Sequence, residues 1–373
     1  MKNNIGIYLH VPFCRRKCDY CDFCSQSASE ETVDRYVSRL CEEIATAPQR
    51  DRHVASVFFG GGTPSLLGVR RMETLVSALH KSYRFEKDCE WTMEANPATV
   101  TAEDARGYLS LGINRVSIGV QSLVDGELLA IGRIHTASDA RECVSLFERA
   151  GARRISLDLM YGLPNQTVDS FSRTLREALS MAGGHLSVYG LMLEEGTPLE
   201  RRRNSLALPS EDEECAMYEL ACRACEDAGY LHYEISNYAR AGEECRHNLR
   251  YWQLLDYVGF GVAAHGCVGA ARSAHTESLL EYLSGDLAAR VYEMRSAHEI
   301  DAERVMLGLR TRFGVSRETF DRVVTETHED FLLQCEAAGY LLRDDARVSL
   351  TDRGMYLSTA ILGRILPDFV SIK

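Results

Sequence analysis

Short apolar stretches alternate along the first half of the chain with longer stretches in which apolar residues recur at helical spacing. Six of the short stretches have the pattern of β-strands, and most end at glycine, proline or asparagine. They are Ile5–Val11, Val54–Phe59, Cys89–Glu94, Asn114–Gly119, Arg154–Met160 and His185–Gly190. The helical spacing is clearest over Thr32–Ala47, Leu66–Tyr83, Ser138–Ala150 and Ser170–Met181. This succession of β–α units predicts an α/β fold in which helices cover a parallel sheet, either open or curled into a partial barrel.

The alternation ends after Gly190. A polar, arginine-rich stretch is followed by a predicted helix over about 210–228, and residues 233–269 are rich in Tyr, Asn, Gly and His, which is typical of loops. From about residue 297, three predicted helices, a hairpin over 340–350 and a last helix are typical of a small winged-helix-like α+β unit. We therefore expect a barrel core over 1–195, an extension over 196–290 and a C-terminal domain over 291–373.

The charge balance restricts the partners. The chain of 373 residues has 42 Lys and Arg against 54 Asp and Glu, a net charge of -12. Arginines of the C-terminal unit are mixed with acidic residues, so no basic stripe for nucleic acid is present. No apolar run reaches the roughly 18 residues of a membrane span. Met1–Asn4 leads into the first strand without a signal pattern, so we expect a cytoplasmic protein.

Four of the thirteen cysteines, Cys14, Cys18, Cys21 and Cys24, fall within eleven residues. An odd number of cysteines in a long chain from a reducing compartment argues against a disulfide framework. Thiolates at the spacing Cys14-x3-Cys18-x2-Cys21 can hold three irons of a four-iron cluster and leave the fourth iron open. A zinc site is the alternative, because Cys24 would complete a set of four ligands.

Seven segments together carry a family resemblance. They are YLHVPFCRRKCDYCDF (8–23), GGGTP (60–64), EANP (94–97), SIGVQS (117–122), GRIH (132–135), DLMYGLP (158–164) and HNLRYW (247–252). In this order they resemble the radical S-adenosylmethionine proteins. Within that superfamily they are similar to the branch that contains oxygen-independent coproporphyrinogen III oxidase and the HemW-type heme chaperones. The resemblance implies a partial (β/α)6 barrel followed by a winged-helix-like C-terminal domain.

The same resemblance implies two cofactors. A [4Fe-4S] cluster would be bound by Cys14, Cys18 and Cys21, with Cys24 as a neighbour that is not a ligand. S-adenosylmethionine on the open iron would contact Tyr8, Gly61 and Glu94. The oxidase branch has a second S-adenosylmethionine position, whose matching residues here are Tyr20, Gly62, Thr63, Gln121, Arg133, Asp158 and Gly190. These side chains suit such roles, since glycine permits close approach and arginine can pair with a carboxylate.

His247 is the histidine to which the resemblance draws attention, because the HNLRYW segment is similar to HemW-type proteins specifically. A neutral imidazole in an aromatic-rich loop is a suitable axial ligand for heme iron. The alternative is a hydrogen-bonded structural histidine. His10, His135 and His265 compete for the ligand role, but they lie in segments shared with the oxidase branch.

Three features favour a heme chaperone over the oxidase: Cys14 lies close to the first residue, Phe23 stands where the oxidase has an extra cysteine, and the HNLRYW segment is present. The implied partners are heme and a heme-acceptor protein, for example a respiratory one. Radical decarboxylation of coproporphyrinogen and radical methyl transfer stay open as alternatives, as does cleavage of S-adenosylmethionine. The chain departs from the family's Pro-Gly at Val262-Ala263, and a positive φ there would strain Ala263.

Overall fold

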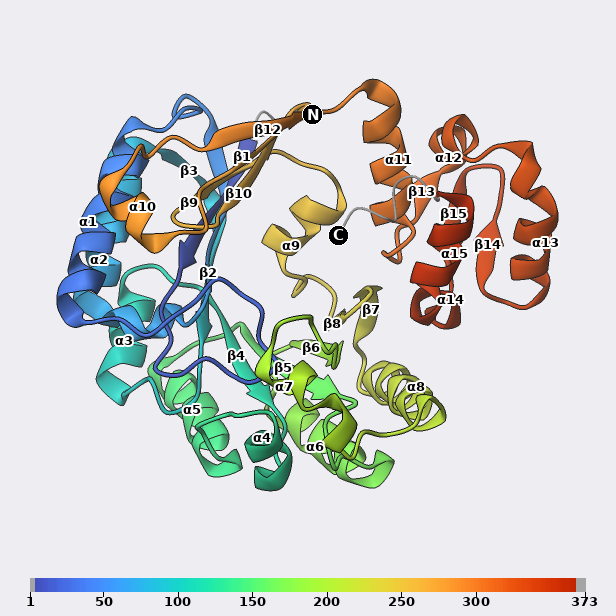
Figure 1. The fold of residues 1–373 in the computed structure, drawn as a ribbon, viewed down its shortest axis with the longest axis horizontal. Coiled ribbons are helices and arrows are strands. Elements are labelled where there is room, and N and C mark those ends of the chain that lie inside the picture. Colours follow the sequence, from blue (N-terminus) through green and yellow to red (C-terminus); the bar gives the residue numbers. More distant parts are fainter. Residues whose placement is uncertain (1–3, 367–373) are drawn as a thin grey trace.

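The computed structural model describes residues 4–366, which form one large sheet, one small sheet and their covering helices (Figure 1). The strands are β1 (Asn4–Val11), β2 (His53–Gly61), β3 (Arg84–Ala95), β4 (Arg115–Gln121), β5 (Ile155–Tyr161), β6 (His185–Gly190), β7 (Leu231–Glu234), β8 (Asn237–Ala239), β9 (Tyr257–Phe260), β10 (His265–Val268), β11 (Ala271–Ala274), β12 (Arg290–Met294), β13 (Val315–Ser316), β14 (Leu341–Arg343) and β15 (Arg347–Leu350). The helices are α1 (Glu30–Thr46), α2 (Gly68–Ser82), α3 (Ala102–Ser110), α4 (Asp125–Ala130), α5 (Ala137–Ala150), α6 (Val168–Met181), α7 (Pro198–Arg201), α8 (Glu211–Asp227), α9 (Arg246–Trp252), α10 (Leu279–Ser284), α11 (Ala297–Gly308), α12 (Arg317–Val323), α13 (Glu329–Ala337), α14 (Asp352–Tyr356) and α15 (Ser358–Ile365).

The large sheet confirms the predicted partial barrel. Strands β1 to β6 are parallel and lie side by side in chain order, with β9 added in parallel beside β1 and β8 antiparallel beside β6. The order across the sheet is β12-β11-β10-β9-β1-β2-β3-β4-β5-β6-β8-β7, so the two edge strands do not meet. Helices α1 to α6 lie on its outer side, whereas α9 lies on the inner side (Figure 1).

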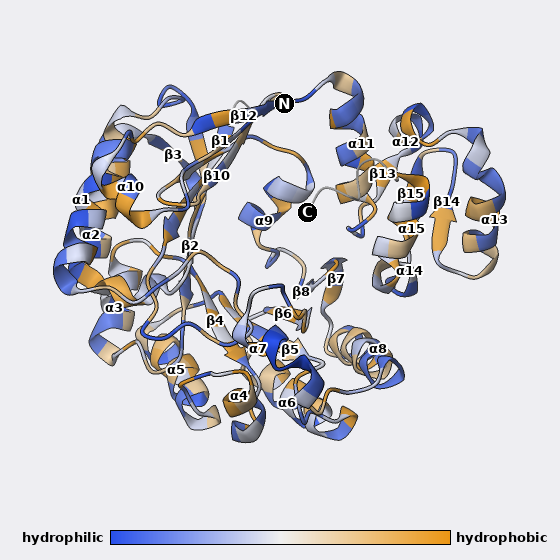
Figure 2. Ribbon diagram, in the orientation of Figure 1, coloured by the Kyte–Doolittle hydropathy of each residue, from blue (hydrophilic) through white to orange (hydrophobic). Residues whose placement is uncertain are grey.

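Alternation along the strands separates an apolar outer face from a polar inner face. On β1, Ile5, Ile7 and Leu9 are fully buried among the core residues. The alternate residues Tyr8 and His10 line the inner cavities. Each fully buried aliphatic side chain contributes about 1.5–3 kcal/mol, so the helical layer stabilises the barrel while the inner face stays free for polar groups. Figure 2 shows the same division, with hydrophilic residues on the outward faces of the covering helices.

Local signals explain where the covering helices begin. Thr101, Thr136 and Thr167 are N-caps of α3, α5 and α6, and each takes part in a reciprocal capping box. Such a cap satisfies N–H groups that have no partner within the helix, and its loss costs about 1 kcal/mol. The helices are therefore placed by residues that immediately precede them.

The segment over 233–269 is more regular than the sequence indicated. Instead of a long loop it contains β8, α9, β9 and β10. These elements are short, and α9 has no side-chain cap of its own at Cys245. Short strands and an uncapped helix carry little periodic signal, which is why the sequence pattern resembled a loop.

Residues from α11 onward form a second unit with its own core, whereas β12, which precedes α11, is the edge strand of the large sheet. Helices α11 to α13 pack with a small antiparallel sheet of order β13-β15-β14 around a core that includes Phe320, Val348 and Leu362. This matches the predicted α+β unit. The precise bounds of the three predicted domains stay a prediction, and their outermost residues, 1–3 and 367–373, lie outside the described residues. Within 4–366, no helix has both the length and the apolar character needed to cross a membrane.

Ala263 adopts the strained backbone that its neighbourhood predicted. Its φ is 56°, and its N–H donates to the carbonyl of Thr276 at 2.8 Å, which holds the loop in place. Because this conformation costs a residue with a Cβ about 1–2 kcal/mol, Ala263→Gly is expected to raise the free energy of unfolding by about 0.5–1 kcal/mol. The matched change Ala264→Gly, at a buried neighbour outside the positive-φ region, is expected to lower it. Urea unfolding checks both, and a destabilised Ala263→Gly variant would contradict the argument.

Candidate functional site

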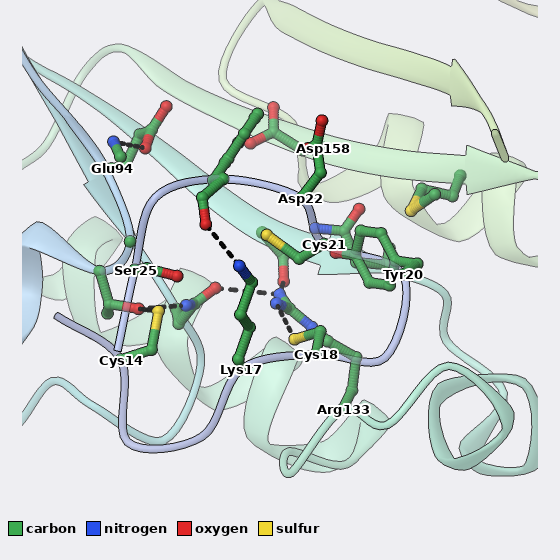
Figure 3. Close-up of a pocket in the computed structure, with 18 of the residues that line it drawn as sticks. Cys14, Lys17, Cys18, Tyr20, Cys21, Asp22, Ser25, Glu94, Arg133 and Asp158 are labelled. Atoms are coloured by element: carbon green, nitrogen blue, oxygen red, sulfur yellow. Dashed lines mark hydrogen bonds between the residues drawn. The ribbon is translucent and has the colours of Figure 1, made fainter. Parts of the chain in front are cut away.

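A cavity of about 450 Å³ opens at the carboxyl ends of the barrel strands (Figure 3). Functional groups of parallel barrels collect at this end because the strand-to-helix loops meet there. Twelve of the predicted site residues line the cavity: Cys14, Cys18, Tyr20, Cys21, Gly61, Gly62, Thr63, Glu94, Gln121, Arg133, Asp158 and Gly190. The structure thus brings together residues that are spread over most of the first half of the chain.

The loop that carries the cysteines is held at both ends and in the middle. The N–H of Cys14 donates to the carbonyl of Gln26 at 3.0 Å, and the N–H of Gln26 donates to the carbonyl of Pro12 at 2.9 Å. Within the loop, the N–H of Cys21 donates to the carbonyl of Cys18 at 3.2 Å. These backbone bonds fix the three thiols on the wall of the cavity, a pre-organised arrangement of the kind that metal ligands require.

A polar chain connects two of the thiols behind the loop. Arg133 donates from Nη1 to Sγ of Cys18 at 3.4 Å and from Nη2 to Oδ1 of Asn96 at 2.9 Å. Asn96 in turn donates to Oγ1 of Thr63 at 2.7 Å, and Thr63 lies 3.5 Å from Sγ of Cys14. In the sequence, Asn96 stands out only as a member of the EANP segment. Its position directly before a proline at a strand end was the available signal.

Two glycines let other parts of the chain pack closely against the backbone at the cavity wall. Gly61 has a φ of 110°, and a Cβ there would lie 2.6 Å from the ring of His10. At Gly62 a Cβ would lie 2.7 Å from the Phe13 carbonyl oxygen and 3.0 Å from Sγ of Cys14. Only glycine fits at either position, because the ring of His10 and the cysteine loop occupy the space that a Cβ would need.

The end of β4 places two further groups of the cavity. The register with β5 shifts between Gly119 and Gln121, and Gln121 has a φ of 65°. A Cβ at Gly119 would lie 2.8 Å from Nη2 of Arg133, so this glycine makes room for the arginine. Non-glycine residues with such a φ cluster at functional sites, and Gln121 is both on the cavity wall and in this conformation.

Two half-buried carboxylates face the same cavity. Glu94 accepts from the N–H of Gly61 at 3.1 Å, and both oxygens of Asp158 lie 3.1 Å from the hydroxyl of Ser117. Burial raises the pKa of Glu94 to about 8, and the Asp158 carboxylate adds to the rise. Burial also raises the pKa of Asp158. A ligand with a positive charge or with N–H and O–H donors would stabilise both ionised carboxylates.

Tyr8 and Cys24 lie outside this cavity. Tyr8 lines two adjoining cavities of about 540 and 200 Å³, which it shares with Glu94, and its hydroxyl is 3.0 Å from Nδ1 of His10. Cys24 lines the larger of these two, and its thiol donates to the carbonyl of Glu277 at 3.4 Å. The fourth clustered cysteine therefore does not line the wall on which the other three lie.

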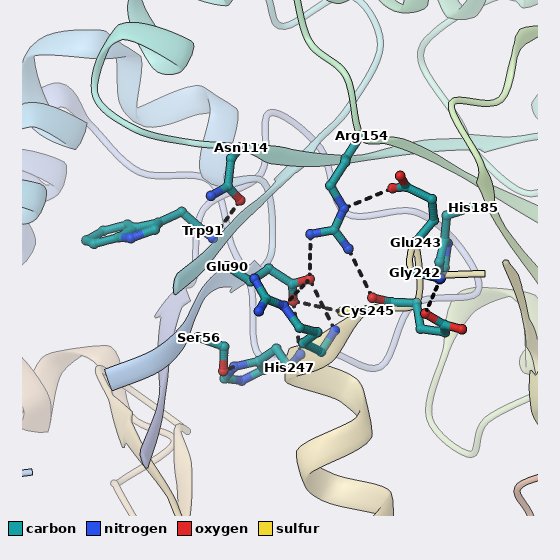
Figure 4. Close-up of polar contacts among 12 residues, drawn as sticks. Ser56, Glu90, Trp91, Asn114, Arg154, His185, Gly242, Glu243, Cys245 and His247 are labelled. Carbon is teal, nitrogen blue, oxygen red and sulfur yellow. Dashed lines mark hydrogen bonds and ion pairs between the residues drawn. The ribbon is translucent and has the colours of Figure 1, made fainter. Parts of the chain in front are cut away.

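The surroundings of His247 differ from the sequence interpretation, which placed it in an aromatic-rich loop. It lies on α9 with no solvent exposure. Nδ1 is 2.8 Å from the hydroxyl of Ser56, and Nε2 is 2.8 Å from the hydroxyl of Tyr251 (Figure 4 shows the Ser56 contact). Burial lowers its pKa to about 3, so the ring is neutral. Both ring nitrogens thus have hydrogen-bond partners in this structure, as the structural alternative expects, and the role of His247 as a heme ligand stays a prediction.

Glu90 explains why α9 forms at this place. This fully buried carboxylate on β3 accepts from the N–H groups of Arg246 and His247 at 3.1 and 3.0 Å and from Nη1 of Arg154 at 2.9 Å (Figure 4). The first N–H groups of a helix need such an acceptor, and a negative charge at that end is also favoured by the helix dipole. A strand residue thus replaces the cap that the local sequence lacks.

The donor set of the main cavity fits a four-iron cluster with three protein ligands. Three thiols lie on one preformed loop, and no fourth thiol and no imidazole lines the cavity among the described residues. Gly62 lies directly beside Cys14, since a Cβ there would be 3.0 Å from Sγ. A closed zinc site would need a fourth ligand, and Cys24 is turned to Glu277.

Comparison with known proteins places the chain. The family described as Radical SAM superfamily matches residues 8–178, and the HemN C-terminal domain matches 296–357. The chain is 35% identical to the heme chaperone HemW of Bacillus subtilis over 97% of its length and 99% of the relative's. It is 33% identical to HemW of Haemophilus influenzae, with 98% of each chain covered.

HemW of Escherichia coli is 40% identical over 71% of this chain and 70% of its own. The solved structure of coproporphyrinogen III oxidase (HemN) from Escherichia coli, described as a radical SAM enzyme, superimposes with a TM-score of 0.83 at 21% identity. It covers 97% of this chain and 89% of that one, and it shows the shared fold. Because the chain is 33–35% identical to two HemW proteins along nearly the whole of each sequence, it belongs to the HemW heme chaperone family of the radical SAM superfamily.

Proposed function

We propose that this protein holds a [4Fe-4S] cluster and S-adenosylmethionine in the barrel cavity and carries heme to an acceptor protein in the cytoplasm, such as a respiratory heme protein. The main support is identity to HemW of Bacillus subtilis along nearly the whole of both chains, combined with a cavity lined by Cys14, Cys18 and Cys21. The assignment of the cluster and of S-adenosylmethionine is supported by the superfamily match and by the three cysteines in the cavity. The assignment of heme delivery is supported by the heme chaperones to which the chain is similar.

Residues of the cavity suit S-adenosylmethionine by their chemistry. When bound, the cluster supplies an open iron as a coordination site and a source of one electron. Glu94 can accept from an amino group, Asp158 from ribose hydroxyls, and Arg133 can pair with a carboxylate. Tyr8 extends this binding region into the adjoining cavities. The remaining members of the proposed binding set are Tyr20, Gly61, Gly62, Thr63, Gln121 and Gly190.

For the axial ligand of heme, His265 has the more suitable surroundings. Its side chain on β10 is exposed, and it borders both the cavity that contains Tyr8 and a second one of about 800 Å³. The ring of Tyr292 lies 6.0 Å away, and Arg272 and Arg290 line the larger cavity. Imidazole can coordinate heme iron, a flat ring can contact the porphyrin, and arginine pairs well with propionates.

A hemin titration of the cluster-loaded protein, followed at the Soret band, tests the proposal. We expect His265→Ala to weaken hemin binding at least about tenfold, the loss of one good interaction. We expect His247→Ala to retain hemin affinity but to unfold more easily, since Ser56 and Tyr251 lose a buried partner. His53→Ala, at an exposed strand residue, is the control.

The same preparations are mixed with an apo heme protein and, separately, with coproporphyrinogen. Transfer of heme without decarboxylation is the expected result. Rapid decarboxylation would overturn the chaperone proposal in favour of the oxidase reaction. Loss of the Soret band in a well-folded His247→Ala variant would return the ligand role to that residue.

A further inference from the structure

Three metal-ligating side chains converge at a place remote from the barrel cavity. Cys222 on α8, His232 on β7 and Asp352 on α14 each present a ligand atom, and these atoms all lie within 4.8 Å of one another. Asp352 belongs to the C-terminal unit, whereas the other two belong to the segment that follows the barrel strands. None of the three takes part in the proposed cofactor or heme sites.

The histidine has the hydrogen-bond pattern of a metal ligand. Nε2 of His232 is 3.3 Å from the carbonyl oxygen of Ile235, and Nδ1 is 2.9 Å from Oδ1 of Asp352. Without a metal, both ring nitrogens can carry a proton, and Nδ1 donates to Oδ1 of Asp352. A bound cation would replace the proton on Nδ1, while Nε2 would keep its N–H on the carbonyl of Ile235. Metal-bound histidines nearly always donate their second N–H to a carbonyl or carboxylate in this way, which fixes the tautomer and the ring.

Two tyrosines hold the other ligands in position. The hydroxyl of Tyr238 is 3.3 Å from Sγ of Cys222 and can donate to a thiolate there. The ring of Tyr238 also stacks on His232, with centroids 4.3 Å apart and an angle of 12° between the planes. Tyr218 donates from its hydroxyl to the backbone carbonyl of Asp352 at 2.9 Å, which holds the start of α14. Each ligand thus has a supporting partner of its own.

We propose that Cys222, His232 and Asp352 bind a borderline-soft divalent cation, Zn²⁺ foremost, with the fourth coordination position open to water. A thiolate and an imidazole favour Zn²⁺ over Mg²⁺ or Ca²⁺, which need mainly oxygen ligands. Because the ligands come from both units, the ion joins the C-terminal unit to α8 and β7. Binding then stabilises the docked arrangement, since separated units cannot assemble the site.

Metal analysis of the cluster-reconstituted protein tests this site. The protein is treated anaerobically with a mild chelator, supplied with Zn²⁺ and freed of excess metal, and zinc and iron are counted together. We expect about one zinc per chain in addition to the iron, the stoichiometry of a single site. Asp352→Asn, at a largely exposed side chain, and Cys222→Ser are expected to reduce zinc to near zero with iron unchanged. Cys215→Ser, at another thiol of α8, is expected to keep both metals.

A second measurement keeps the proposal testable if a variant folds poorly. Zn²⁺ is expected to raise the thermal midpoint of the wild type and of Cys215→Ser, and to leave that of Asp352→Asn unchanged. Cobalt in place of zinc should give the visible bands of a tetrahedral site with a thiolate ligand. Equal zinc content in the wild type and in Asp352→Asn overturns the proposal. Absence of zinc from the wild type also overturns it, and the His232–Asp352 ion pair alone would then connect β7 to the C-terminal unit. Neither result bears on heme binding.

Discussion

Replacement of Cys14, Cys18 or Cys21 by alanine is expected to remove the iron–sulfur cluster, whereas Cys24→Ala is expected to retain it. The three ligands share one cavity wall and one preformed loop. Each substitution leaves one iron of the cluster without its thiolate ligand. Among the described residues, no other thiol and no imidazole lines the cavity to replace that ligand. The thiol of Cys24 donates instead to the carbonyl of Glu277 and faces the adjoining cavity.

The measurement is iron and sulfide content after anaerobic reconstitution, together with the absorption of the cluster. We expect about four irons per chain in the wild type and in Cys24→Ala, and nearly none in the other three variants. Circular dichroism shows whether each apoprotein is folded. If Cys24→Ala lost its iron as fully as Cys18→Ala, the cluster would have four protein ligands, and S-adenosylmethionine would have no iron to bind.

Glu90→Gln is expected to destabilise the protein by about 3–5 kcal/mol, the usual cost of breaking a buried ion pair from one side. The carboxylate is fully buried and bonds to Arg154 and to the first N–H groups of α9. Burial alone would raise its pKa, but Arg115 and Arg154 with the N–H groups of α9 hold the pKa below its usual range. An amide in this place removes the negative charge beside the buried Arg115 and leaves the half-buried Arg154 with Glu243 as its carboxylate partner.

Urea or thermal unfolding measures the effect, with Glu142→Gln as the matched control. Glu142 forms an exposed pair with Arg149, and its loss is expected to cost less than about 1 kcal/mol. The lowered pKa gives a second test. The stability that Glu90 contributes is present above its unfolded pKa and is lost as the pH falls through its folded pKa. The free energy of unfolding of Glu90→Gln should therefore decrease less at acidic pH than that of the wild type. Equal destabilisation by the two variants would falsify the assigned role of Glu90.

Much of the barrel could be predicted from the sequence because its signals are local. Alternation on β1 separates Ile5 and Ile7 from Tyr8, and capping residues such as Thr136 mark the helix starts. These patterns depend on side-chain period and on neighbours within a few residues. The spacing of the cysteines is equally local, so the ligand loop was visible before any contact was known.

Residue identity also indicated the strain at Ala263, since the family resemblance implies a glycine at this position and the φ is positive. The role of His247 did not follow from such reasoning. Whether that ring is free or enclosed depends on Ser56, which is 191 residues away in the chain. A sequence pattern reports the face on which a side chain lies but not the partner that it meets there.

The sequence by itself thus determined the succession of β–α units, the three-cysteine loop and the family to which its segments are similar. The tertiary structure alone decided that Cys24 is turned away from the other thiols, that Asn96 connects Thr63 with Arg133, and that α9 begins at a carboxylate on β3. It also brought Asp352 to Cys222 and His232. The physical reason is the range of the interactions: periodicity and capping act over a few residues, whereas buried polar groups take whichever partner the packing of distant elements provides.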